Sequence, residues 1–155
     1  MGNKQWNDEF GLFNGTDDVR LPVSHSIFSS SKGGSEMSNE SIQPIEAVIQ
    51  HYVDGAKSGR GDDMKPAFHQ DATVFGYIGD DLFAGPIQKL FDWNDENGPA
   101  TELVANIVNI DVEGTIAIAR LESDNWTGHK FTDFFTLLKI DGEWKIMNKV
   151  FHLHA

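Results

Sequence analysis

The chain has 155 residues, a formal net charge of −12 and 39% hydrophobic residues, which suits one folded domain with a possible tail. Its acidity opposes contact with phosphate backbones, so nucleic acid is not expected as a partner. No apolar stretch approaches the roughly 20 residues of a membrane helix, and no secretion signal is evident. We therefore expect no membrane association and a cytoplasmic location. The lack of cysteine excludes disulfides and thiolate metal sites.

Residues 1–36 differ from the rest of the chain. They sustain neither a helical nor a strand period, and residues 29–35 form a Ser/Gly-rich stretch typical of a linker. Met37 follows this stretch and would be an ordinary start for a protein. We predict a flexible or foreign segment over residues 1–36, joined to a domain over residues 37–155. A natural tail, or a short peptide that docks on the domain or on a partner, remains an alternative.

The first half of the domain predicts three helices and two short strands. Ser41 is a helix-capping type, and the helix that follows should end before Gly59. Its apolar positions recur at helical spacing, at Ile45, Val48, Ile49, Tyr52 and Val53. A second short helix is expected from Asp62 or Asp63 through Phe68. Strands are expected at residues 72–75 and 82–84, and a third helix from Ile87 to the breaker at residues 97–99.

The second half predicts four strands joined by tight turns, at residues 103–112, 115–126, 131–140 and 143–154. The Asp141-Gly142 pair is a strong hairpin signal. Each helix and strand has one apolar face to bury. The expected architecture is therefore an α+β domain, in which helices pack on one strongly curved antiparallel sheet.

Two stretches of the sequence carry a resemblance to a known family. IEAVIQHYVDGAKSGRGDDMKPAFHQDATVFGY resembles the opening of nuclear-transport-factor-2-like (NTF2-like, cystatin-like) domains, and FTDFFTLLKIDGEWKIMNKVFHLH resembles their putative lumazine-binding branch. The resemblance covers residues 42–154. It implies a cone whose bent sheet encloses a pocket for a small apolar molecule. It also implies a homodimer formed through the outer face of the sheet.

Tyr52 is the first candidate for chemistry. The QHYV stretch resembles the start of ketosteroid isomerase, and this resemblance implies that Tyr52 donates a hydrogen bond to a developing oxyanion. In that family the base lies just after the DATV-like strand, where this chain has Phe75 and Gly76, neither of which takes a proton. The alternative is a core tyrosine whose hydroxyl finds a polar partner.

Asp133 is the second candidate. It shares one face of its predicted strand with aromatic residues, an environment that disfavours a charged carboxylate and is typical of general acids and bases. If Asp133 instead meets Lys149 on the neighbouring strand, the two form a structural ion pair. Both interpretations stay open.

The remaining candidates are histidines and one tryptophan. His69, expected at the end of the second helix, suits a base or a polar anchor of the pocket, or a residue that bonds nearby carbonyls. His152 and His154 point to one side of the last strand, but no established metal-binding spacing is present. Trp93 is expected to cover the pocket. We predict a ligand-binding set of Tyr52, His69, Trp93, Asp133, Lys149 and His152, with no metal and no cofactor.

Three functions are compatible with these residues. The first is a small-molecule-binding domain without established catalysis. The second is an enzyme of the same fold, of isomerase, dehydratase or cyclase type, in which Asp133 or His69 moves a proton and Tyr52 stabilises an oxyanion. The third is a dimeric protein-interaction module whose N-terminal segment is a peptide bound by the chain itself, by a neighbouring copy or by a separate partner.

Overall fold

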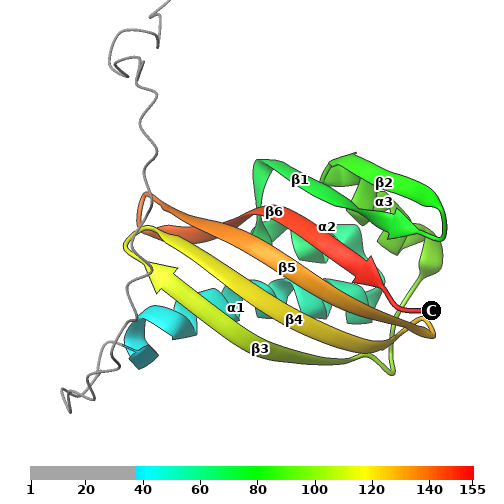
Figure 1. Cartoon of the computed structure of the whole chain (residues 1–155), viewed down its shortest axis with the longest axis horizontal. Helices are drawn as coiled ribbons and strands as arrows, with labels where there is room; N and C mark the ends of the chain where they lie inside the picture. The colour runs from blue at the N-terminus through cyan, green and yellow to red at the C-terminus, as the bar shows by residue number, and fades with distance from the viewer. Residues whose placement is uncertain (1–37) are drawn as a thin grey trace, which may run out of the picture. The chain divides into compact units, whose positions relative to one another are not determined.

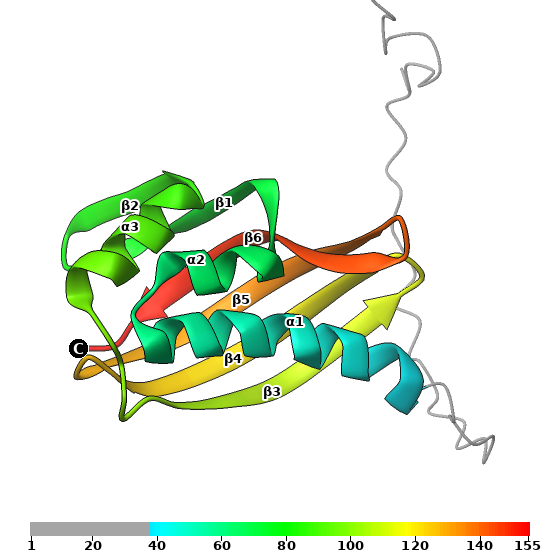
Figure 2. The ribbon, with the colours of Figure 1, turned by 180° about the vertical axis from the view of Figure 1, so that it is seen from behind.

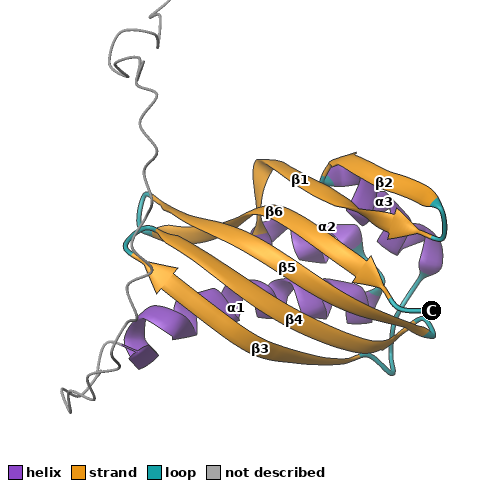
Figure 3. Ribbon diagram, in the orientation of Figure 1, coloured by secondary structure: helices purple, strands orange, loops and turns teal. Residues whose placement is uncertain are grey.

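The computed structural model describes residues 38–155, so the predicted segment over residues 1–36 lies outside the described part of the chain. The described residues form three α-helices and six strands, coloured purple and orange in Figure 3. In chain order they are α1 (Ser38–Ser58), α2 (Gly61–Met64), a single 3₁₀ turn (Lys65–Ala67), β1 (Phe68–Ile78), β2 (Asp81–Pro86), α3 (Gln88–Asn97), β3 (Val104–Glu113), β4 (Ile116–Trp126), β5 (His129–Ile140) and β6 (Glu143–Leu153). Within these residues, no helix combines the length and the apolar character needed to cross a membrane.

The six strands form one sheet in the order β2-β1-β6-β5-β4-β3 (Figure 1). Strands β3 to β6 are consecutive antiparallel neighbours, which confirms the predicted meander. Strand β1 pairs with β2 in antiparallel fashion and with β6 in parallel fashion. Register shifts interrupt several of these pairings, and such bulges bend and twist a sheet. The predicted α+β cone is confirmed, with one parallel strand pair included.

Helix α1 crosses one face of this sheet, as seen from behind in Figure 2. Its buried side chains recur three or four residues apart and include Ile45, Ile49, Tyr52 and Ala56. They pack in one core with the inward side chains of the strands, among them Leu121. The apolar side of α1 therefore packs against the inward face of the sheet, where alternate residues of each strand point, and both surfaces are removed from water.

The boundary between the second helix and the first strand differs from the prediction. The helix was expected to continue through Phe68, with His69 at its end, but both residues belong to β1. Helical structure stops at Ala67, after Pro66, because Phe68 enters the sheet opposite Ile146 of β6. Sheet pairing with a strand almost 80 positions later overrides the local helical pattern.

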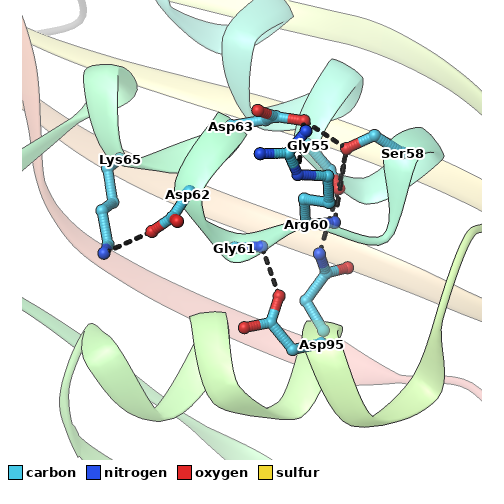
Figure 4. A network of polar contacts seen from close by, with 9 residues as sticks. Gly55, Ser58, Arg60, Gly61, Asp62, Asp63, Lys65 and Asp95 are labelled. Atoms are coloured by element: carbon cyan, nitrogen blue, oxygen red, sulfur yellow. Dashed lines mark hydrogen bonds and ion pairs between the residues drawn. The ribbon is translucent and has the colours of Figure 1, made fainter.

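A polar network ties the three helices together (Figure 4). The side-chain amide of Asn94 donates to the Gly55 carbonyl at 3.0 Å, and Asp95 accepts from the Gly61 backbone N–H. The α1–α2 junction is close-packed, since a Cβ on Gly55 would lie 2.3 Å from the Met64 side chain. These contacts fix α3, and with it Trp93, over one end of the sheet.

Candidate functional site

Three polar side chains from three different elements meet in the core between α1 and the sheet. The Tyr52 hydroxyl of α1 donates to Oδ2 of Asp133 on β5 at 2.8 Å. The Lys149 ammonium of β6 lies 3.0 Å from the other carboxylate oxygen, Oδ1. Strand register explains the pairing: Asp133 is opposite Phe151, so Lys149 is its diagonal neighbour on the same face.

All three side chains are removed from water. Asp133 is 0% exposed, Tyr52 1% and Lys149 2%. Oδ1 has the ammonium beside it but no aligned hydrogen bond within residues 38–155, so its contact with Lys149 is an ion pair. Two buried charges lose their hydration, and their attraction often does no more than offset that loss. The pair is therefore not explained by the stability of the fold.

Aromatic rings surround the Lys149 ammonium. Its Nζ lies 4.6 Å from the ring centre of Phe151 and 5.5 to 5.9 Å from those of Tyr52, Trp126 and Phe131. Ring faces attract a cation, but they neither accept its protons as a carboxylate does nor replace water. The amine consequently has one strong polar partner, Asp133.

Burial shifts the acid–base properties of both neighbours of Asp133. The pKa of Lys149 is lowered from the ordinary lysine value of 10.5, chiefly because burial disfavours the ammonium, while the charge of Asp133 opposes this shift. The pKa of Tyr52 is raised well above 10, first by burial and then by the negative charge of Asp133. Tyr52 thus remains a hydrogen-bond donor, and the neutral form of Lys149 becomes easier to reach.

Lys149 also lines an apolar cavity of about 20 Å³. The wall consists of Ile78, Phe83, Leu90, Trp93, Trp126, Phe131, Lys149 and Phe151. Among the described residues of this wall, Lys149 is the one ionisable side chain, whereas Asp133 and Tyr52 lie behind the wall. Since Ile78, Phe83 and Trp93 are half-buried, they form the side that reaches solvent. The volume suits about one water molecule, so a larger ligand needs these side chains to move.

Gly76 allows Phe151 to occupy this wall. A Cβ at position 76 would lie 2.5 to 2.6 Å from three atoms of the Phe151 ring, a distance that packed side chains do not tolerate. Phe75 points to the other face and is 42% exposed. The place where the isomerase resemblance puts a base therefore holds a glycine covered by a ring, and the carboxylate of this site comes from β5.

The structure distributes the predicted site residues unevenly. Tyr52, Asp133 and Lys149 are in mutual contact, and Trp93 lies on the cavity wall. His69, near the start of β1, accepts a hydrogen bond from the Asp71 backbone N–H through Nδ1. It does not line the cavity.

The C-terminal histidines lie apart from the cavity wall as well. His152 is exposed and contacts His154 edge to face, with 4.7 Å between ring centres. Within residues 38–155, no three His, Asp or Glu side chains gather in a way that would hold a metal ion.

Trp126 is a wall residue that the sequence pattern did not reveal. It is 1% exposed and lies against Tyr52, Trp93 and Phe131. A register shift between Ser123 and Trp126 turns its side chain inward. Its indole N–H is buried with no hydrogen-bond partner among the described residues. The turn at Thr127-Gly128 was the only local signal near it.

Comparison with known proteins agrees with this architecture. Residues 40–152 match the family described as "Putative lumazine-binding". The chain belongs to this family. Two solved relatives are NTF2-like proteins of unknown function. One, from Methylobacillus flagellatus KT, is 54% identical (77% of this chain, 97% of the relative, TM-score 0.75); the other, from Shewanella baltica OS155, is 39% identical (79% and 99%, TM-score 0.73).

A curated relative carries an enzyme name. The aldolase FrzH of Cladobotryum sp. is 33% identical over 109 residues, which cover 70% of this chain and 87% of that protein. The family and the NTF2-like fold are therefore established, and the reaction named for this relative belongs to that protein.

Proposed function

We propose that this family member binds a small, largely apolar carbonyl compound in the cavity and promotes proton transfer at the carbon beside the carbonyl. The observation that carries the proposal is the position of Lys149, an ionisable group on a wall that the described part of the chain otherwise lines with apolar side chains, beside a buried carboxylate. Enolate formation of this kind is shared by isomerisations and aldol reactions. The aldolase relative supports this class of reaction.

The buried environment suits such a step. Charge that develops on the carbonyl oxygen would be stabilised by the Lys149 ammonium in a region with little water, where electrostatic interactions are strong. Once Lys149 has passed its proton to Asp133, its neutral amine can take the proton from the carbon beside the carbonyl, which regenerates the ammonium next to the enolate. Tyr52 holds the Asp133 carboxylate in place by its hydrogen bond. The aromatic wall would contact the apolar part of the ligand.

The alternative is that the protein binds such a ligand without catalysing a reaction. Two measurements on the full chain separate binding from catalysis. A thermal-shift screen against lumazine-, flavin-, steroid- and polyketide-like ring compounds and simple cyclic ketones reports binding. A ligand at a hundred times its dissociation constant stabilises by about 2.7 kcal/mol. Exchange of the α-protons of cyclohexanone for deuterium, followed by NMR, reports proton transfer.

We expect exchange above the buffer rate for the wild type and a loss of roughly 10²-fold or more of the catalysed part for Asp133→Asn. Asp111→Asn, at an exposed position of β3, is the matched control and should leave exchange unchanged. Binding without exchange would identify a ligand carrier. If the chain neither binds any of these compounds nor accelerates exchange, the proposed function is wrong.

We further propose that two copies pair through the outer face of the sheet. Phe75, Val150 and Phe134 are register neighbours across β1, β6 and β5, and all are 42 to 55% exposed. Val108, Ile116 and Ile118 extend this apolar surface over β3 and β4. Proteins that act as monomers rarely expose a large contiguous apolar patch, so a homodimer is the partner that we expect.

The other expectations from composition remain proposals. They are a cytoplasmic location, no nucleic-acid partner, no cofactor and a separate segment over residues 1–36.

A further inference from the structure

We propose that Lys149 is a nucleophile that forms a covalent imine with an aldehyde or ketone in the cavity. This inference rests on the proposed function and specifies its substrate class and its chemical intermediate. It assigns Lys149 a bond to the substrate, beyond a charge near it.

The position of the amine is the first support. Lys149 lines the cavity, whereas Asp133, its one close polar neighbour among residues 38–155, lies behind it. The rings of Phe151, Tyr52, Trp126 and Phe131 surround Nζ without binding its lone pair. Once deprotonated, the amine therefore has a free lone pair beside an apolar space of the kind that would hold a carbonyl group.

The means of deprotonation is the second support. An amine attacks a carbonyl only in its neutral form, and burial favours that form for Lys149. Lys65 shows the opposite case in the same molecule, because its exposed ammonium is hydrogen-bonded to Asp62, which raises its pKa. Asp133 is placed to accept the proton that Lys149 must lose, at 3.0 Å.

The step balances with groups that are present. The neutral amine adds to the carbonyl carbon, a C–N bond forms as the C=O π bond breaks, and the proton that the added nitrogen loses passes to the oxygen to give a carbinolamine. Asp133 returns its proton as the C–O bond breaks, one water leaves and an iminium ion remains. The iminium draws electrons from the neighbouring carbon, whose proton passes to the water just released, and an enamine remains.

Trp126 supplies a further group for this step. Trp126 borders the same cavity, and its buried indole N–H has no partner within residues 38–155. A buried donor without a partner is costly, and the oxygen of a bound carbonyl or carbinolamine would satisfy it. We assign Trp126 the role of a positioning residue for that oxygen.

Acetylacetone tests the inference on the full wild-type chain. A 1,3-diketone condenses with a neutral lysine amine to a stable enaminone, which needs no reductant and absorbs in the near ultraviolet. We expect one adduct near neutral pH, with a mass gain of one acetylacetone less one water, located on Lys149 by peptide mapping. As pH is raised, the rate of adduct formation on the protein should level off below pH 10.5. The rate for free Nα-acetyl-lysine should keep rising through pH 10.5.

Variants sharpen the test. Lys149→Met should abolish the adduct completely, and Lys139→Met, at an exposed lysine of β5, should leave it unchanged. Trp126→Phe should slow its formation without moving the pH profile. Peptide mapping of the wild type decides the question even if Lys149→Met does not fold.

The outcomes separate this inference from the proposed function. No adduct, an adduct spread over exposed lysines, or a pH profile like that of free lysine would overturn the imine. Ketone exchange that persists without an adduct would leave the proposed function standing, with Lys149 acting through its charge. An adduct on Lys149 without exchange would support the imine and contradict the proposed proton transfer.

Discussion

On strands β5 and β6, charged side chains are buried on one face of the sheet and apolar side chains are exposed on the other, the opposite of the usual distribution. On β5, Asp133 is 0% exposed and its neighbour Phe134 is 55% exposed; on β6, Lys149 is 2% exposed and its neighbour Val150 is 45% exposed. Charged groups point into the core, and apolar groups point away from it. Folding alone favours the opposite arrangement, because buried charge and exposed apolar surface both reduce the stability of a monomer.

This reversal indicates two sites on one sheet. The inner face has the Asp133–Lys149 pair beside a cavity, which we interpret as a reactive centre. The outer face has an apolar surface around Phe134 and Val150, which we interpret as a subunit interface. Because strand side chains alternate, each strand supplies both sites at adjacent positions.

The largest effect is expected at the inner face. Lys149→Met should reduce the free energy of unfolding by about 3–5 kcal/mol, since it leaves the Asp133 carboxylate buried without a charge partner. Urea unfolding followed by tryptophan fluorescence measures the change. Lys139→Met, at an exposed position of the same sheet, should stay within about 0.5 kcal/mol of the wild type.

A double variant tests whether charge is the cause. Asp133→Asn combined with Lys149→Met removes both charges and keeps an acceptor for the Tyr52 hydroxyl. It should recover most of the stability lost in Lys149→Met. A double variant as unstable as the single one would show that the side chains matter for packing and that charge coupling is minor.

A smaller effect is expected at Tyr52. Tyr52→Phe removes the hydroxyl that donates to Asp133, and should reduce the free energy of unfolding by about 1–3 kcal/mol near neutral pH. The folded pKa is raised above the unfolded value of 10.0, so the unfolded chain releases this proton first, and the contribution is lost as pH rises above 10. The gap between wild type and variant should therefore narrow above pH 10. Tyr77→Phe, at a position 60% exposed, should leave the free energy of unfolding close to that of the wild type. A difference in the free energy of unfolding between the wild type and Tyr52→Phe that does not change with pH would contradict this assignment.

The smallest change in monomer stability is expected at the outer face, together with a clear change in assembly. Phe134→Glu places a charge in the centre of the proposed interface and should convert dimers to monomers in light scattering after gel filtration. The stability of the monomer should change little, because Phe134 is 55% exposed. Thr101→Glu, in the exposed link between α3 and β3, should leave assembly unchanged. A monomeric wild type would contradict the interface.

The sequence by itself determined the elements and much of the inward face. The period of residues 45–53 predicted α1, the Gly-containing turns predicted the meander of β3 to β6, and period two placed Asp133 on one face with its aromatic neighbours. These features depend on residues close together in the chain, where helical and strand geometry fix which side chains share a face.

Only the tertiary structure decided which groups meet. The sequence left Asp133 with two interpretations, and the fold joins them by placing Lys149 on the wall of a cavity, with Asp133 and Tyr52 behind it. The inward turn of Trp126 depends on a register shift, with neighbouring Asn125 at a φ of 60°. His69 lies in β1 because that strand pairs with β6, at the far end of the domain. Strand register and bulges are set by pairing between distant segments, and a shift of one residue reverses every side chain, so no local pattern determines them.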